Sequence, residues 1–189
     1  AYGVTNAYGD VQDLFLETVD PASENHYLEG DESVPFEMRT ETILVRDKEA
    51  TDGYRRETIT IRSTKRGPIV SDHGIVNLGG RTVSLKWGAS LASGPEIGYD
   101  KMFFAQSANE VDEAAQLIDI NMFNIVFADV DGNFGRRSTG KIPNRRIGEG
   151  VTPVAVTDDA PYWTSWIPKD EMPGEFNPER GWSGTANHD

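Results

Sequence analysis

Apolar and polar residues alternate in short runs along much of this chain. The clearest runs lie at residues 42–46, 57–62 and 81–87, and Ile59 and Ile61 share one face of the second run. A repeat of two residues places apolar side chains on one face of an extended strand, so we expect half-buried β-strands in these places. Residues 124–130 and 133–137 flank an Asp131-Gly132 pair, which predicts a β-hairpin.

One helix is well signalled. Ser107 and Glu110 form an S-x-x-E capping box, and apolar residues follow at helical spacing, which predicts a helix over about 108–120. The last forty residues are rich in proline and aromatic residues and lack periodicity. The expected fold class is α+β and mainly β, with antiparallel strands, this one helix and a long irregular C-terminal segment. A length of 189 residues favours a single domain over 1–189.

The composition excludes several classes of function. Thirty-one acidic against 18 basic residues give a net charge of −13, which disfavours binding to nucleic acid. The same acidity is typical of the solvated surfaces of proteins from high salt, where salt screens self-repulsion. The absence of cysteine excludes disulfides and thiolate metal sites. No apolar run approaches the ~20 residues of a membrane span, and neither a G-x-S-x-G elbow nor a zinc motif occurs.

Two acidic segments are candidate cation sites. Asp10 and Asp13 stand three residues apart, with the carbonyl of Gln12 between them, and hard oxygen ligands of this kind suit calcium. An acidic surface turn explains the same residues equally simply. The second segment, 129–133, imitates the start of an EF-hand loop, but Phe134 replaces the required glycine and Gly140 the final glutamate. A hairpin turn is therefore the better interpretation of that segment.

Four separated stretches, taken in order, resemble the middle of the catalytic β-chain of the penicillin acylase family. Together they extend over almost the whole chain, and the ordered set is more specific than any one of them. They are GVTNAYGDVQD (3–13), TKRGPIV (64–70), FNIVFADVDGNFGRRSTGKIPNR (123–145) and WIPKDEMPGEFNPERGWSGTAN (166–187).

The resemblance implies an N-terminal-nucleophile hydrolase fold and the hydrolysis of an acyl amide. In that chemistry an N-terminal serine, exposed by self-cleavage, attacks the amide and its own α-amine acts as the base. The resemblance further implies that Asn6 donates its backbone N–H, and Asn187 its side-chain amide, to the oxyanion. Val4, Trp87 and Phe123 correspond to positions that contact the acyl group, and such an apolar wall favours aromatic or aliphatic acyl chains.

The resemblance also favours a structural calcium ion at Asp10, Gln12 and Asp13, and no organic cofactor. The remaining ligands in the family come from outside a segment like this one, so we expect weak calcium binding by the chain alone. The serine nucleophile is expected upstream of Ala1. The expected partners are therefore the remainder of a parent acylase, namely its α-chain and the N-terminal and C-terminal parts of the β-chain, and a small-molecule acyl amide. We expect the isolated chain to be inactive.

The acyl group and the cellular compartment stay open, since the family acts on β-lactams, acyl-homoserine lactones and similar amides and its bacterial members are commonly exported. A non-enzymatic acidic β scaffold or binding module, with a calcium or carbohydrate site, is the alternative. Convergence of Asn6 and Asn187 on one cavity would favour the acylase. Exposed, coplanar indoles of Trp163, Trp166 and Trp182 would favour a carbohydrate site.

Overall fold

The computed structural model describes residues 1–91 and 98–187. Contacts within the chain group it into two compact units. Unit 1 comprises Ala1–Gln12, Trp87–Gly150 and Pro161–Asp189, and unit 2 comprises Asp13–Lys86 and Val151–Ala160. The single domain expected over 1–189 stays a prediction. Each unit is described by itself below.

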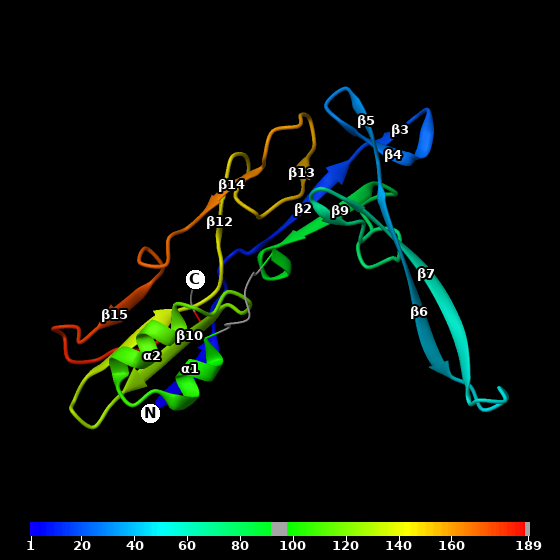
Figure 1. Cartoon of the computed structure of the whole chain (residues 1–189). Coiled ribbons are helices and arrows are strands. Elements are labelled where there is room, and N and C mark those ends of the chain that lie inside the picture. Colours follow the sequence, from blue (N-terminus) through cyan, green and yellow to red (C-terminus); the bar gives the residue numbers. More distant parts are fainter. Residues whose placement is uncertain (92–97, 188–189) are drawn as a thin grey trace. The chain divides into compact units, whose positions relative to one another are not determined.

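Unit 1 is built on a four-stranded antiparallel sheet with the strand order β1-β10-β11-β15 (Figure 1). The strands are β1 (Tyr2–Asn6), β10 (Phe123–Ala128), β11 (Phe134–Ser138) and β15 (Gly174–Phe176). The pairing of β10 with β11 confirms the predicted hairpin. β1 forms one edge of the sheet, so its outer main-chain groups have no partner strand within the described sheet.

The hairpin turn uses the acidic segment that imitates an EF-hand. The Asp129 carboxylate accepts hydrogen bonds from the backbone N–H groups of Asp131 at 3.0 Å and Asn133 at 2.9 Å. The Asn133 side chain donates to the same carboxylate and lowers the pKa of Asp129. Gly132 adopts a φ of 89°, which a glycine reaches without steric cost. These acidic residues therefore close a turn on themselves.

Two helices, α1 (Tyr99–Phe104) and α2 (Ala108–Ala115), pack on one face of this sheet. Their apolar side chains form a core with those of β10, comprising Met102, Ala108, Val111, Ala114, Ala115, Ile118, Ile125 and Phe127. α2 is the helix that the sequence signals clearly, and α1 is an additional one. The N-cap of α1 is Gly98, which has no side chain to cap the helix, so the usual sequence signal of a helix start is missing there.

The start of α2 is as predicted, and its end is not. Ser107 accepts a hydrogen bond from the Glu110 backbone N–H at 3.2 Å, while the Glu110 carboxylate reaches the Gln106 N–H at 2.7 Å. The helix ends at Ala115 instead of near 120. After the helix, the Leu117 N–H donates to the Ala114 carbonyl and the Ile118 N–H to the Ala115 carbonyl. These bonds follow the tighter i→i−3 pattern of a 3₁₀ turn. Ile118 is still fully buried, which explains why the apolar pattern outlasts the helix.

The C-terminal part of unit 1 is less irregular than expected. It contains β14 (Trp163–Trp166) and the edge strand β15, and β14 pairs with β12 (Pro143–Arg145). A short 3₁₀ helix, η1 (Gly88–Leu91), follows the last strand of unit 2. These strands have three or four residues each, too few for an alternating pattern to be recognised in sequence.

Unit 2 consists of short sheets and one long hairpin. The sheet β13-β2-β9 contains β2 (Gln12–Glu17), β9 (Thr82–Trp87) and β13 (Val154–Ala155). β13 pairs with β2 in parallel, an exception to the antiparallel pairing expected from sequence. A second sheet contains β3 (Val19–Asp20), β4 (Ser23–Glu29) and β5 (Glu32–Pro35), and a third contains β6 (Glu37–Arg46), β7 (Tyr54–Thr64) and β8 (Gly67–Pro68).

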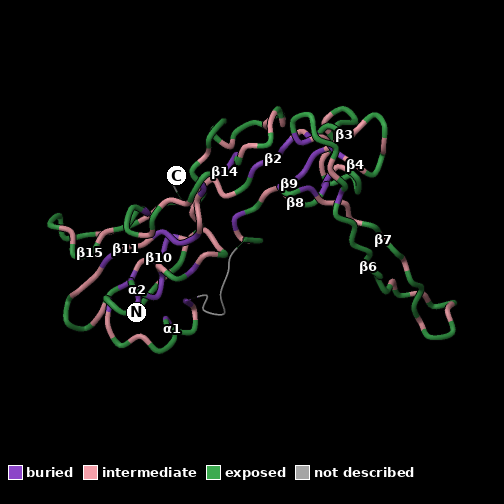
Figure 2. Tube along the Cα trace, turned by 45° about the horizontal axis from the view of Figure 1, so that its top comes forward, coloured by how far each residue is buried: buried purple, intermediate pink, exposed green. Residues whose placement is uncertain are grey.

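The predicted strands at 42–46, 57–62 and 81–87 are confirmed within β6, β7 and β9. β6 and β7 pair over ten residues, from Glu37↔Ser63 to Arg46↔Tyr54. In Figures 1 and 2 this hairpin runs out from the short strands of unit 2, and exposed or half-buried residues line it. The register places each apolar residue of one strand opposite a polar or charged residue of the other, as in Arg39↔Ile61 and Ile43↔Glu57. Two strands alone are marginally stable in water, and main-chain pairing holds this hairpin together.

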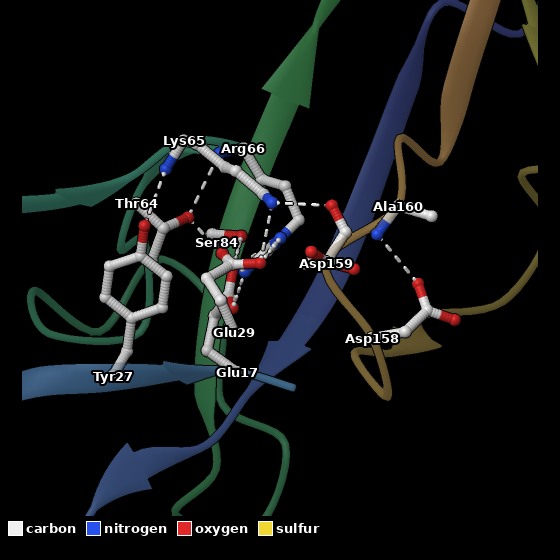
Figure 3. Close-up of polar contacts among 10 residues, drawn as sticks. All are labelled: Glu17, Tyr27, Glu29, Thr64, Lys65, Arg66, Ser84, Asp158, Asp159 and Ala160. Atoms are coloured by element: carbon white, nitrogen blue, oxygen red, sulfur yellow. Dashed lines mark hydrogen bonds and ion pairs between the residues drawn. The ribbon is translucent and has the colours of Figure 1, made fainter. Parts of the chain in front are cut away.

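A buried ion cluster, composed of Glu17, Glu29, Arg66 and Lys65, joins β2, β4 and the β7–β8 turn (Figure 3). The Arg66 guanidinium donates to Glu17 at 2.8 and 2.6 Å, and to Glu29 at 3.1 and 2.6 Å. The side chains of Arg66 and Glu17 are 3% and 0% exposed. Ser84 of β9 donates a further bond to Glu17 at 2.6 Å. Arg66, Glu17 and Glu29 are thus paired away from water, while Lys65 reaches Glu29 from a half-exposed position.

Removal of Arg66 should be costly, because it takes away the ion-pair partner of the buried Glu17 and leaves Glu29 with Lys65 alone. Arg66→Met is expected to lower the free energy of unfolding by about 3–5 kcal/mol, measured by urea denaturation followed by circular dichroism. Arg55→Met is the matched control, since the Arg55–Glu57 ion pair is half exposed. It should cost less than about 1 kcal/mol. Equal losses for the two variants would contradict the role given to the cluster.

The cluster also predicts sensitivity to acid. Burial by itself raises the pKa of Glu29, but hydrogen bonds from Arg66 and Lys65 outweigh burial and hold this pKa below its ordinary value of 4.5. The folded state then gains stability from Glu29 that is complete above about pH 4.5 and lost as the pH falls through the lowered pKa. Glu29→Gln should flatten the fall in melting temperature at acidic pH. If the melting temperatures of the wild type and Glu29→Gln fall equally with pH, Glu29 is not the source of the acid sensitivity.

Candidate functional site

The register between β1 and β10 determines which way the Asn6 backbone points. The backbone N–H of Ala128 bonds to the Ala1 carbonyl at 2.9 Å, and that of Ala7 to the Met122 carbonyl at 3.1 Å. Bonded and non-bonded pairs alternate along an antiparallel ladder, so the pair Asn6↔Phe123 between them is a non-bonded one. The N–H of Asn6 is therefore directed away from β10, toward the open edge of the sheet, and is available as a donor.

An open cleft of unit 1 lies directly after Asn6. It is lined by residues 7–12, by Trp87 and by residues 120–123. The Gly88 N–H donates to the Val11 carbonyl at 2.8 Å and holds the first of these segments beside the second. The structure thus brings Trp87 and Phe123, two of the predicted acyl-group contacts, to the lining of one cleft. Their role as substrate contacts stays a prediction.

Val4, the third predicted contact, is not part of this lining among the described residues. It precedes Asn6 by two residues on the same face of β1, where it is 46% exposed. It therefore presents apolar surface beside the cleft rather than within it.

Asn187 lies at the end of the described chain, in unit 1, and is exposed. Its φ of 57° is left-handed, a conformation that asparagine tolerates better than most residues. Four residues earlier, Ser183 lines a hollow together with Ala1, Tyr2 and Gly3 of the β1 end. The C-terminal segment therefore passes close to β1, and convergence of Asn187 with Asn6 stays a prediction.

The three predicted calcium ligands, Asp10, Gln12 and Asp13, differ in their surroundings. Asp10 of unit 1 forms an ion pair with Arg145 at 3.2 Å, and Arg145 also donates to the Asp10 carbonyl at 3.0 Å. Gln12 begins β2, and Asp13 is buried in unit 2. Within the described ranges, no three acidic or histidine side chains gather as a metal site. Calcium binding at Asp10, Gln12 and Asp13 stays a prediction.

The aromatic residues do not form the platform that a carbohydrate site would need. Trp163 is buried, and its ring meets that of Trp166 edge-on, with an angle of 75° between the planes. Trp182 is exposed and stacks with the Arg180 guanidinium. The first two indoles therefore serve packing between β14 and its surroundings.

The whole chain is similar to proteins of one known family. The penicillin amidase family model matches residues 1–189, the whole chain. The chain belongs to the penicillin amidase family. It is 31% identical to an acyl-homoserine lactone acylase, QuiP, of Pseudomonas aeruginosa, across 100% of the chain and 23% of that protein. It is 28% identical to penicillin G acylase of Escherichia coli, across 100% of the chain and 21% of that protein.

The fold is also that of the family. The structure matches thermostable penicillin G acylase from Alcaligenes faecalis with a TM-score of 0.76 at 24% identity, over 98% of this chain and 33% of the other. The expected N-terminal-nucleophile hydrolase fold is thereby confirmed. The chain spans less than a quarter of the length of these curated family members, so a larger protein contains the homologous segment. Among the described residues, no helix has the length and apolar character needed to cross a bilayer.

Two polar features of the site escaped prediction. Arg145, the partner of Asp10, lies 135 residues away, and nothing in the local sequence connects the two. The second is Asn124 of β10, which is only 2% exposed. A signal for it does exist, since it is a single amide within the apolar run FNIVFA of β10. A polar residue inside a buried strand normally has a specific hydrogen-bond partner.

Proposed function

We propose that the parent of this chain is an acylase that hydrolyses a linear acyl amide, and that this chain supplies its oxyanion donors and part of its acyl-group wall. The observation that carries the proposal is the Asn6 N–H, which the register directs to an open sheet edge beside the cleft of Trp87 and Phe123. Family membership over the full chain supports the same chemistry. QuiP, named an acyl-homoserine lactone acylase, and the penicillin acylases suggest the classes of substrate to test first.

In this proposal a serine hydroxyl from outside the chain attacks the amide carbonyl carbon, and the hydroxyl proton passes to the α-amine of the same serine. The negative charge that develops on the carbonyl oxygen is held by the Asn6 N–H and the Asn187 side-chain amide. As the tetrahedral intermediate collapses, the C–N bond breaks, the leaving nitrogen takes the proton from the α-ammonium, and the acyl group stays on the serine as an ester. Water then attacks this ester, the serine oxygen regains its proton, and the acid is released. The chain alone lacks the nucleophile and is proposed to be inactive.

The test is amine release from acyl amides by the full-length protein and by the 189-residue chain. Asn187→Gly removes the amide without straining the left-handed backbone, and is expected to lower kcat by about 10²–10³-fold. Asn177→Gly is the matched control, because Asn177 also has a left-handed φ, of 47°, but caps the start of β11. It should leave kcat unchanged. Turnover by the isolated chain, or an unaffected Asn187→Gly enzyme, would overturn the proposal.

We further propose that the parent protein binds a structural calcium ion through Asp10, Gln12 and Asp13, together with ligands from outside this chain. Since Asp10 already pairs with Arg145, calcium must compete with a guanidinium, which predicts weak binding by the chain alone. Calorimetric titration of calcium into the full-length protein should detect binding that Asp10→Asn weakens at least tenfold. Asp31→Asn, at an exposed turn of unit 2, is the control. Undiminished binding by Asp10→Asn would remove this site.

A further inference from the structure

Asn124 is a buried amide whose contacts converge on the Asn6 peptide. It lies in β10, opposite Thr5 in β1 and opposite Ser138 in β11. Its side chain is almost fully buried, and so is that of Ser138. Burial of an amide between two strands is unfavourable unless its polar atoms are bonded, and here both ends of the amide have partners.

The two ends of the Asn124 amide have different partners. The Ser138 hydroxyl donates to Asn124 Oδ1 at 2.7 Å. Asn124 Nδ2 donates to the Asn6 carbonyl at 3.4 Å, at the long end of the hydrogen-bond range. Because Ser138 occupies the oxygen, the amide is oriented with its N–H₂ group toward β1. A chain of two hydrogen bonds therefore links β11, through β10, to the last residue of β1.

The main chain of Asn124 restrains the same residue from the other side. The pair Thr5↔Asn124 is a hydrogen-bonded pair of the ladder, so the Asn124 N–H donates to the Thr5 carbonyl. In a trans peptide the carbonyl and the following N–H point in opposite directions, so this bond aims the Asn6 N–H toward the open edge. Asn124 thus restrains both peptide planes that flank the Asn6 Cα.

We infer that Asn124, oriented by Ser138, is a positioning residue that holds the Asn6 backbone so that its N–H points at the oxyanion. This inference rests on the proposed function, since it assigns a purpose to the N–H that Asn6 presents. Oxyanion donors act only when they are preorganised, and a displacement of about 1 Å can cost about 10²-fold in rate. The role of Asn124 is to prevent that displacement without touching the substrate.

The test uses kinetics of the full-length enzyme, with each rate normalised to titrated active sites. Asn124→Asp keeps an acceptor for Ser138 but replaces the donor to Asn6 with an oxygen that can carry a buried negative charge, and it should lower kcat about tenfold or more with KM within twofold. Ser138→Ala, a milder change for folding, should lower kcat by a few fold. Ser138→Thr keeps the hydroxyl that Ser138→Ala removes, so its kcat should be close to that of the wild type.

A matched control is available in unit 1. Asn144 of β12 donates to Ser165 of β14 at 2.9 Å, so it forms the same kind of cross-strand Asn–Ser pair at an exposed position. Asn144→Asp should leave kcat and KM unchanged. If Asn124→Asp and Ser138→Ala show the wild-type kcat per active site, or lose only active sites, the side chain is structural and the inference is overturned.

A second readout separates this inference from the proposed function. If the wild-type protein hydrolyses no amide, the proposed function fails, and hydrogen exchange then tests Asn124 by itself. Backbone exchange over residues 4–9 should be faster in Asn124→Asp than in the wild type, while exchange in the β6–β7 hairpin stays the same. Unchanged exchange over residues 4–9 would show that Asn124 does not hold the Asn6 backbone.

Discussion

The pairing of β1 with β10 is the interaction on which the rest of unit 1 depends. It joins Tyr2–Asn6 to a strand more than a hundred residues later in the chain, and a shift of one residue would exchange the two faces of β1. The register turns the Asn6 N–H outward, brings Phe123 opposite Asn6 and sets Asn124 opposite Thr5. The direction of a single backbone donor is therefore fixed by a contact between distant parts of the sequence, and the local segment alone does not determine it.

Many helices, strands and turns of the fold can be predicted from local sequence patterns. The capping box at Ser107, the Asp131-Gly132 turn and the alternation in β6 and β7 each predict an element that the structure contains. The exceptions have local causes too. α1 begins at a glycine that cannot cap it, and the apolar pattern of α2 continues to Ile118 because packing continues after the helical hydrogen bonds have changed.

The candidate site is less predictable, since its parts come together through tertiary pairing. Family resemblance pointed to Trp87 and Phe123, and the structure places both at one cleft. No local pattern could reveal the Asp10–Arg145 pair, or the link from Ser138 to Asn6, because each joins segments that only the sheet brings together. The buried ion cluster belongs to the same class. A net charge of −13 suggests a solvated acidic surface, yet Glu17 and Glu29 are used inside the protein, each matched to Arg66.

The long β6–β7 hairpin has a consequence for how the sequence can vary. Its tip, from Asp47 to Gly53, is held by bonds within the turn itself, such as those from Gly53 to Ala50 and from Asp47 to Gly53. Exposed tips of this kind tolerate inserted residues well, because few packed side chains depend on them. A purification tag or a fluorescent reporter inserted between residues 48 and 52 should therefore leave the rest of the fold intact.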